Sequence, residues 1–286
     1  DIAVEGDAIE VAKECEKRWG GKLTAHERFG TAKVSLPDGS RVDFATCRAE
    51  FYEKPAVLPK VERASIREDL YRRDFAINAM AICIWPDEFG KLWDFFGGLS
   101  DLRARRIRVL HNLSFVEDPT RILRAARYEQ RLGFRLERQT ERLLRQAVEQ
   151  GLLSLVSADR IRNELVRSLQ EPKVARVMRR LEELGVLREI HPTWSLGQAG
   201  VARLKRVPRA ISWFERSVGR KLGRPHLVAL CASVQGLLPS ERESLLRALR
   251  FPSDDQQAVM RATEVADQLL PRACLLYTSP SPRDRG

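Results

Sequence analysis

The sequence predicts an α+β protein in which a small domain with a mixed β-sheet comes first and an all-helical region follows. One observation is a hairpin signal: "TAKVSL" and "RVDFAT", at 31–36 and 41–46, flank the turn "PDGS". A second is that apolar residues recur with helical spacing from Glu117 to about residue 270. The length of 286 residues is enough for two or more compact units.

Strands and helices are mixed in the first third of the chain. Segment 1–4 ("DIAV") predicts a strand and 7–21 a helix that ends in two glycines. The remaining expectations follow in chain order: the hairpin at 31–46, an irregular connection at 55–64, a helix that runs into an apolar strand at 65–84, a turn at 85–90, a returning segment at 91–96, and a turn with a helix at 97–107.

The helical region is punctuated by glycine and proline. Its first helices are predicted at 119–132, 137–150, 157–169 and 171–184. The last segment, "CLLYTSPSPRDRG", loses the helical pattern, so we expect residues 273–286 to be disordered and not native to the gene.

The amino-acid composition indicates what kind of partner the protein binds and in which cellular compartment it works. The formal net charge of +11 and a pI near 9.8 indicate a polyanionic partner, most often nucleic acid. Five scattered cysteines without a C-x-x-C pair favour a reducing, cytoplasmic location and argue against a zinc site. No apolar run approaches the ~20 residues that a membrane helix needs, and no signal peptide is visible.

The stretch "VEDPTRILRAARYEQRLGFR", at 116–135, displays a row of arginines. Arg121, Arg124, Arg127 and Arg131 fall within an arc of about 120° on a helix. No acid within the stretch is spaced to neutralise the last three, so we expect this face to meet an anion. Two plainer interpretations stay open: Asp118-Pro119 is an ordinary helix start, and the arginines form a solvated basic face.

Two aspartates could form a metal site. Val42 and Phe44 share one face of their strand, so Asp43 points to the other face. An aspartate on such a face is usually only solvated, but Asp1 belongs to a neighbouring predicted strand. Two carboxylates brought together can hold Mg²⁺, which completes its coordination with water and phosphate.

The segment "YRRDFAINAMAI" contributes a third group of polar residues. Arg72, Arg73, Asp74 and Asn78 bring two cations and two hydrogen-bonding side chains to the start of a buried strand. The plainer interpretation is a helix end with an Arg–Asp pair.

Taken together, these segments resemble the class II tRNA nucleotidyltransferase and bacterial poly(A) polymerase family. The matching pieces are "DIAVEGDA", "RVDFATCR", "DLYRRDFAINAMAI", "WDFFGGLSDLRARRIRVL", "EDPTRILRAARYEQRLGF" and "SADRIRNEL", in the family's order over about residues 1–170. The resemblance implies a nucleotidyltransferase head domain at 1–113, truncated at its N-terminus, a helical neck at 114–177 that binds nucleotide and RNA, and an RNA-binding helical body at 178–272.

The resemblance also implies residue roles. Asp1 matches the second aspartate of the family's D-x-D metal pair and Asp43 its third acidic position, which makes both of them catalytic Mg²⁺ ligands. The predicted nucleotide-binding residues are Arg73, Asp74, Asn78, Asp118, Arg121, Arg124 and Arg127. Asp118 and Arg121, with Glu117, match the motif that reads the base edge of CTP or ATP. Arg160 and Glu164 match a neck motif that we expect to be structural.

The implied reaction is attack of a tRNA 3′-hydroxyl on the α-phosphate of CTP or ATP, without a template. The family's Gly-rich turn and the first aspartate of D-x-D are absent here, so we expect this fragment alone to be inactive. Three alternatives stay open: an A-adding or poly(A)-type enzyme, a non-catalytic RNA-binding module, and a helical interaction scaffold. The scaffold would leave the "RRDF" and "EDP" blocks unexplained.

Overall fold

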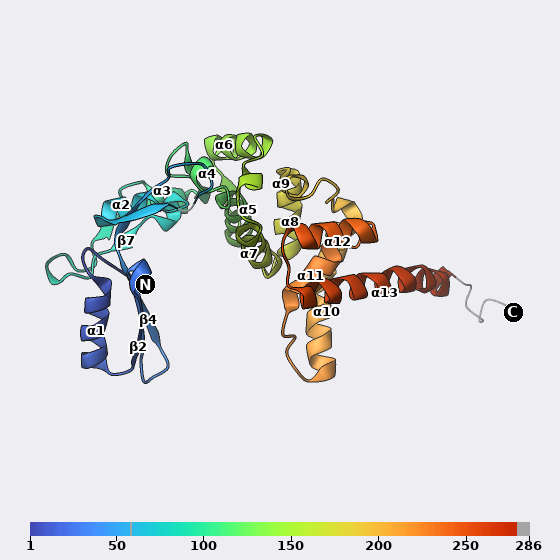
Figure 1. Cartoon of the computed structure of the whole chain (residues 1–286), viewed down its shortest axis with the longest axis horizontal. Coiled ribbons are helices and arrows are strands. Elements are labelled where there is room, and N and C mark those ends of the chain that lie inside the picture. Colours follow the sequence, from blue (N-terminus) through green and yellow to red (C-terminus); the bar gives the residue numbers. More distant parts are fainter. Residues whose placement is uncertain (58, 279–286) are drawn as a thin grey trace. The chain divides into compact units, whose positions relative to one another are not determined.

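The computed structural model describes residues 1–57 and 59–278, and the chain divides into two compact units. Unit 1 is Asp1–Glu117 and unit 2 is Asp118–Gly286, and each is described by itself. Unit 1 holds the sheets and several short helices, whereas unit 2 is almost entirely helical (Figure 1). The predicted α+β class is therefore confirmed. The division of the helical part at 177/178 stays a prediction.

Unit 1 is built on a four-stranded sheet with the strand order β1-β4-β3-β2. Strand β1 runs parallel to β4, and β3 is antiparallel to both of its neighbours. The predicted hairpin is confirmed, because Ser35 pairs with Arg41 across the turn. The elements of unit 1 are β1 (Ile2–Val4), α1 (Ala8–Trp19), β2 (Lys22–His26), η1 (Glu27–Phe29), β3 (Thr31–Ser35), β4 (Arg41–Thr46), β5 (Arg48–Phe51), β6 (Lys60–Arg63), α2 (Ile66–Tyr71), η2 (Ala76–Asn78), β7 (Ala81–Ile82), η3 (Pro86–Glu88), β8 (Leu92–Trp93), α3 (Gly98–Arg103), β9 (Arg106–Ile107) and α4 (Ser114–Glu117).

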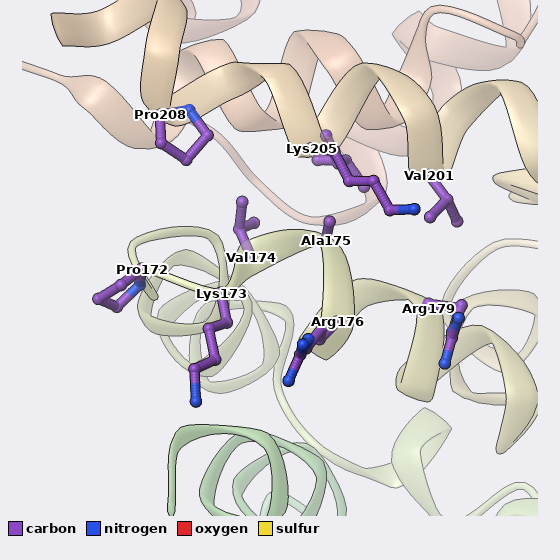
Figure 2. Close-up of a pocket in the computed structure, with 10 residues that line it drawn as sticks. Pro172, Lys173, Val174, Ala175, Arg176, Arg179, Val201, Lys205 and Pro208 are labelled. Atoms are coloured by element: carbon purple, nitrogen blue, oxygen red, sulfur yellow. The ribbon is translucent and has the colours of Figure 1, made fainter. Parts of the chain in front are cut away.

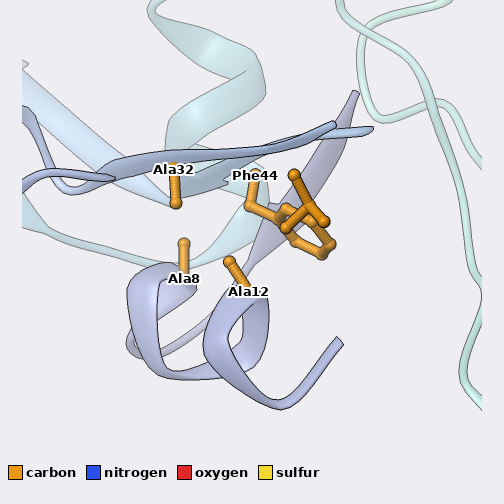
Figure 3. Close-up of a cluster of buried hydrophobic side chains, with 5 residues drawn as sticks. Ala8, Ala12, Ala32 and Phe44 are labelled. Carbon is orange, nitrogen blue, oxygen red and sulfur yellow. The ribbon is translucent and has the colours of Figure 1, made fainter. Parts of the chain in front are cut away.

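Helix α1 covers one face of this sheet. Asp7 starts the helix by accepting the backbone N–H groups of Ile9 and Glu10 at 3.0 and 3.3 Å. The small side chains of Ala8 and Ala12 let the helix pack closely against the sheet (Figure 3). The sheet residues beneath them are Ala32, Val34 and Phe44. Polar residues of β3 and β4 must therefore lie on the opposite face.

Four strands of unit 1 were not predicted, and one of them, β9, lies in the segment 97–107 for which a turn and a helix were expected. Strand β2 follows the Gly20-Gly21 pair, and β5 pairs antiparallel with β6. The prediction of an irregular connection at 55–64 is wrong for Lys60–Arg63, which is strand β6. All four residues of β6 are exposed, so the strand lacks the apolar alternation by which a half-buried strand is predicted. Segments 65–84 and 91–96 contain α2, β7 and β8.

Unit 2 is a set of helices whose apolar faces pack together. On α8, Val174, Val177, Met178 and Leu181 are buried at helical spacing, and the helix contacts α5, α7 and α10. The four helices predicted from 119 to 184 are confirmed, with ends shifted by at most three residues. The elements of unit 2 are α5 (Arg121–Leu132), β10 (Arg135–Leu136), α6 (Arg138–Glu149), η4 (Leu152–Leu155), α7 (Ala158–Leu169), α8 (Val174–Glu183), α9 (Val186–Ile190), α10 (Gly197–Val218), α11 (Pro225–Val234), α12 (Pro239–Ala248) and α13 (Ser253–Thr278).

The C-terminal helix is longer than predicted. Helix α13 continues to Thr278, so the backbone of 273–278 is helical where disorder was expected. The rest of that predicted segment, 279–286, lies outside the described residues. Among the described helices, none combines the length and the apolar character that crossing a membrane requires.

Candidate functional site

The register of β1 and β4 puts the two predicted metal ligands at neighbouring positions, on the face of the four-stranded sheet opposite α1. Ile2 pairs with Phe44 in the parallel register of β1 and β4. Extending that register by one residue places Asp1 beside Asp43. Phe44 points into the core under α1, so both aspartates belong to the opposite face, where Lys33 of β3 pairs with Asp43. Their roles as metal ligands stay predictions.

The carboxylate of Asp43 is available to a cation. Its Oδ2 is 2.8 Å from Arg41 Nη2, and the side chains of both residues are partly exposed, at 32 and 58%. An ion pair in contact with solvent typically contributes only about 0–1 kcal/mol, so a metal ion could displace Arg41 at little cost. Two carboxylates fit Mg²⁺, because this ion commonly uses one or two protein oxygens and completes its shell with phosphate and water. The described residues contain no group of three or more potential ligands.

Buried Asp69 holds the two arginines of the "YRRD" segment. The exposed fraction of Asp69 is 2%, and its Oδ1 accepts Arg72 Nη2 at 2.7 Å and the backbone N–H of Arg48 at 3.2 Å. Its Oδ2 accepts Arg73 Nη2 at 3.0 Å. Burial alone would raise the pKa of Asp69, but the charges and hydrogen bonds of Arg72 and Arg73 outweigh it and lower that pKa. Asp69 thus stays ionised and fixes both guanidinium groups.

Arg73 and Asp74 have different surroundings. The Arg73 side chain is 40% exposed, while its Nε is buried without a hydrogen-bond partner among the described residues. Asp74 is buried, and its Oδ1 accepts the backbone N–H of Phe75 and Asn78 Nδ2, both at 2.9 Å. The structure therefore brings Asp74 and Asn78 together, and their bond holds η2 in place. Of Arg73 and Asp74, Arg73 is the one whose side chain solvent can reach.

Arg124, Arg127 and Arg131 of α5 are neutralised inside unit 2. Arg127 is 5% exposed, and its Nη2 lies 3.1 Å from Oε2 of Glu164. Arg124 Nη1 lies 3.5 Å from the other oxygen of Glu164, and Arg131 Nε donates to Glu171 at 2.9 Å. The expectation that Arg124, Arg127 and Arg131 lack acidic partners is wrong. The acids come from α7 and from the residues just before α8, which are distant in sequence.

Tyr128 lies among the same arginines. The guanidinium carbons of Arg124, Arg127 and Arg131 are 5.6, 4.9 and 5.8 Å from the centre of its ring. The electron-rich face of an aromatic ring stabilises nearby cations, so Tyr128 adds to the compensation by Glu164 and Glu171. The hydrogen bond to Glu171 raises the pKa of Arg131. Arg121, at the start of the helix, is also buried, with 4% exposed.

Asp118 organises the turn that leads into α5. Its Oδ1 accepts the backbone N–H of Thr120 at 3.0 Å and the Thr120 hydroxyl at 2.6 Å. The same oxygen accepts Arg160 Nη2 of α7 at 2.8 Å. The helix begins at Arg121 with Thr120 as its cap, two residues later than predicted. Arg160 thus fixes the carboxylate for which a base-reading role is predicted.

Two residues that support the site were missed by sequence reasoning. Asp69 precedes Arg72 and Arg73 by three and four positions, the spacing at which helical side chains meet, so this signal was present in the sequence. Glu171 gave no local signal, because it lies 40 residues from Arg131.

Comparison by sequence and comparison by structure find the same kind of protein. The family model described as "Poly A polymerase head domain" matches residues 1–108, and the one described as "Probable RNA and SrmB-binding site of polymerase A" matches 133–196. An A-adding tRNA nucleotidyltransferase of Geobacter sulfurreducens is 47% identical over 215 residues. A solved CCA-adding enzyme is 40% identical with a TM-score of 0.84, and the alignment covers 94% of this chain. A solved tRNA-processing enzyme is 35% identical with a TM-score of 0.76.

The chain spans only part of these proteins. The alignment with the Geobacter relative spans 75% of this chain but only 24% of the length of that relative. The chain covers 63% of the solved CCA-adding enzyme. The alignment with the tRNA-processing enzyme spans 90% of this chain and 70% of that enzyme.

Proposed function

The chain belongs to the family of tRNA nucleotidyltransferases and poly(A) polymerases, and from this premise we propose that it adds C, A or both to the 3′ end of tRNA. The observation that carries the proposal is the parallel register in which Ile2 of β1 pairs with Phe44 of β4, because that register, extended by one residue, makes Asp1 and Asp43 neighbours. The 3′-oxygen of the RNA attacks the α-phosphorus of CTP or ATP. The bond from that phosphorus to the bridging oxygen breaks, and pyrophosphate leaves.

The residues of unit 1 bind and orient the reacting groups. Asp1 and Asp43 would hold Mg²⁺, which when bound neutralises charge on the phosphates and favours ionisation of the attacking hydroxyl. Arg73, fixed through Asp69 and accessible to solvent, binds the triphosphate. Asp74 and Asn78 keep the segment after Arg73 in its conformation through their mutual hydrogen bond.

The residues of unit 2 select the base. Asp118 offers carboxylate oxygens and Arg121 offers N–H donors, a combination that complements the Watson–Crick edge of adenine or cytosine. Arg160 restricts Asp118 to one orientation, which base discrimination requires. Arg124 and Arg127 act mainly by holding α5 to α7 through Glu164.

Among the possible specificities, kinship with the A-adding Geobacter relative favours addition of A alone. The cytoplasm is the compartment we propose, since the described cysteines Cys15, Cys47, Cys83 and Cys231 are free thiols.

The test uses the full-length protein encoded by the gene. It is incubated with tRNA that lacks the terminal A, the terminal CA or the whole CCA, and with one labelled nucleoside triphosphate at a time. Addition of A only to tRNA ending in CC identifies an A-adding enzyme, and stepwise addition of C, C and A identifies a CCA-adding enzyme.

A matched pair of variants tests the carboxylate. Asp43→Asn should lower incorporation by roughly 100-fold or more, because a ligand of the reacting centre is lost. Asp38→Asn, in the exposed turn before β4, should retain the wild-type rate. Failure of the wild-type protein to incorporate any nucleotide, with RNA binding retained, would favour the non-catalytic RNA-binding module.

A further inference from the structure

His111 connects two segments of unit 1 that the proposed function assigns to the nucleotide. Its Nε2 lies 3.3 Å from Oε2 of Glu117, the residue directly before Asp118. Its ring also stacks on the ring of Tyr71, with the ring centres 5.1 Å apart and the planes at 29° to each other. Helix α2 ends at Tyr71, two residues before Arg73. One imidazole thus contacts both the segment of the triphosphate-binding arginine and the carboxylate next to Asp118.

The same histidine holds the short helix that carries Glu117. Helix α4 is a single turn, and its first residue, Ser114, donates its backbone N–H to the carbonyl oxygen of His111 at 3.2 Å. The backbone of His111 therefore begins the turn, and its side chain reaches the residue that ends it. The side chains of His111 and Glu117 are only 15 and 26% exposed. Water and salt screen such a contact less than they screen an exposed ion pair.

A fixed carboxylate is what discrimination between bases needs. Adenine and cytosine present an exocyclic amino group, whereas guanine and uracil present a carbonyl oxygen at the same place. A carboxylate accepts a hydrogen bond from the amino group and repels the carbonyl oxygen. The side chain of glutamate is flexible, so a small error in its position weakens this discrimination. Nε2 of His111 removes that freedom by donating its N–H to one oxygen of Glu117.

We propose that His111 is a positioning residue for base recognition. It holds the carboxylate of Glu117 in one orientation, and with it the turn after which Asp118 follows. The stacking on Tyr71 fixes the plane of the imidazole, and the imidazole fixes the carboxylate. This inference rests on the proposed function, because it takes the nucleotide to be CTP or ATP.

Selectivity for the base tests the inference, because a ratio of two rates does not depend on how much of the protein is folded. The full-length protein extends tRNA with an incomplete 3′ end, and kcat/KM is measured for ATP against GTP, or for CTP against UTP if the wild type adds C. His111→Ala should lower this ratio by roughly 10-fold, mainly through a higher KM for the preferred nucleotide. A purely structural role would lower kcat and leave the ratio unchanged, which would overturn the inference.

Two replacements that each keep a donor locate the contact. The amide nitrogen of glutamine lies about as far from the backbone as Nε2 of histidine, whereas that of asparagine lies nearer, close to the place of Nδ1. His111→Gln should therefore keep the ratio within about twofold of the wild type, and His111→Asn should lose as much as His111→Ala. Equal ratios in the glutamine and asparagine variants would contradict the inference, even if His111→Ala does not fold.

A double variant shows whether His111 acts through Glu117. In protein that carries Glu117→Ala, the further change His111→Ala should alter the ratio by less than about twofold, because the carboxylate that His111 holds is gone. Losses that multiply would mean that His111 acts by another route, and the inference would fail.

Two controls accompany these variants. His26→Ala removes an exposed histidine at the end of β2, in the same unit. Lys205→Gln changes a residue of unit 2 that lines a groove between α8 and α10 (Figure 2). Both should leave the ratio unchanged, and a loss in either one as large as in His111→Ala would overturn the inference.

The outcomes also separate the inference from the proposed function. If the wild-type protein adds no nucleotide, the proposed function fails, and the dissociation constants of the same nucleotide pairs, measured by equilibrium dialysis without tRNA, decide on His111 by the same ratio. If the wild type adds nucleotide and His111→Ala keeps its ratio, only the inference fails.

Discussion

Glu164 holds three guanidinium groups at once. One oxygen is 3.1 Å from Arg127, and the other contacts Arg124 and Arg167. Glu164 and Arg127 are both nearly buried, at 6 and 5% exposed. Separating a buried pair by removing one member leaves an uncompensated charge in the protein interior. This carboxylate should therefore matter more to stability than surface ion pairs do.

The substitution Glu164→Gln should lower the free energy of unfolding by about 2 kcal/mol, because buried Arg127 would lose its nearer carboxylate and keep only that of Glu171, 3.7 Å away. Urea unfolding monitored by circular dichroism measures this through the midpoint. Glu149→Gln, at an exposed position on α6, should change the midpoint little. If the two variants unfolded at the same urea concentration, Arg127 would not depend on Glu164.

Glu189 should make the free energy of unfolding depend on pH. Burial raises the pKa of its carboxyl group to about 7, although Oε1 accepts the backbone N–H of Leu153 at 2.7 Å. Its Oε2 is buried without a partner among the described residues. The folded state thus binds this proton more tightly than the unfolded state. The contribution of protonated Glu189 to the free energy of unfolding is therefore complete below about pH 4.5 and is lost as pH rises through 7.

Glu189→Gln should therefore match the wild-type protein in unfolding free energy near pH 4.5 and exceed it at pH 8, since glutamine cannot ionise. Urea unfolding at a series of pH values gives the difference between the two curves. Curves that stay parallel from pH 4.5 to 8 would show that Glu189 does not titrate as proposed.

Among the secondary-structure elements, the start of α3 shows how closely the chain packs around η2. The side chain of Asp94 accepts the backbone N–H groups of Gly98 and Leu99 at 2.6 and 2.9 Å, which satisfies the first donors of the helix. A Cβ at Gly98 would lie 2.2 Å from the carbonyl oxygen of Ala76 in η2. Only glycine fits this contact.

Gly98→Ala should lower the free energy of unfolding by about 2 kcal/mol, because α3 and η2 would have to separate. It should also weaken ATP binding, since η2 includes Asn78, the partner of Asp74. Gly223→Ala is the control, because a Cβ there meets no atom within 4 Å. Thermal unfolding and nucleotide titration measure both effects. Equal melting temperatures would contradict the close contact.

The sequence correctly predicted the helices and strands whose own residues show a local pattern, such as turn residues or regular apolar spacing. The hairpin of β3 and β4 has its turn residues, and the neck helices have apolar spacing and end signals. Strand β6 has neither, because all its residues are exposed. The compensation of Arg127 could not be predicted from its helix, because Glu164 follows 37 residues later and meets it only when α5 packs on α7.

In the whole molecule, the excess of positive charge and the predicted catalytic aspartates lie in different units. The aspartates lie in unit 1, which has nearly balanced charge, and the excess of basic residues lies in unit 2. Tight binding of RNA and transfer of nucleotide should therefore be separable by substitution.

Asp43→Asn, which should abolish most incorporation, should leave the affinity for a fluorescent minihelix made of a tRNA acceptor stem and T arm within about twofold of wild type, because RNA affinity comes mainly from cations that contact phosphate. Fluorescence anisotropy at fixed salt measures this affinity. A loss of binding comparable to the loss of incorporation would show that unit 1 supplies much of the RNA affinity.

The unequal distribution of basic residues also bears on kinetics. A polyanion that diffuses toward this protein is attracted over a distance of about one Debye length, roughly 10 Å at 0.1 M salt, and that attraction comes from the helices. Under the proposed function, capture of RNA by the basic residues of unit 2 and transfer of nucleotide at the aspartates of unit 1 should be distinct events in time. Rising ionic strength should slow the first event in stopped-flow mixing well before it alters the second.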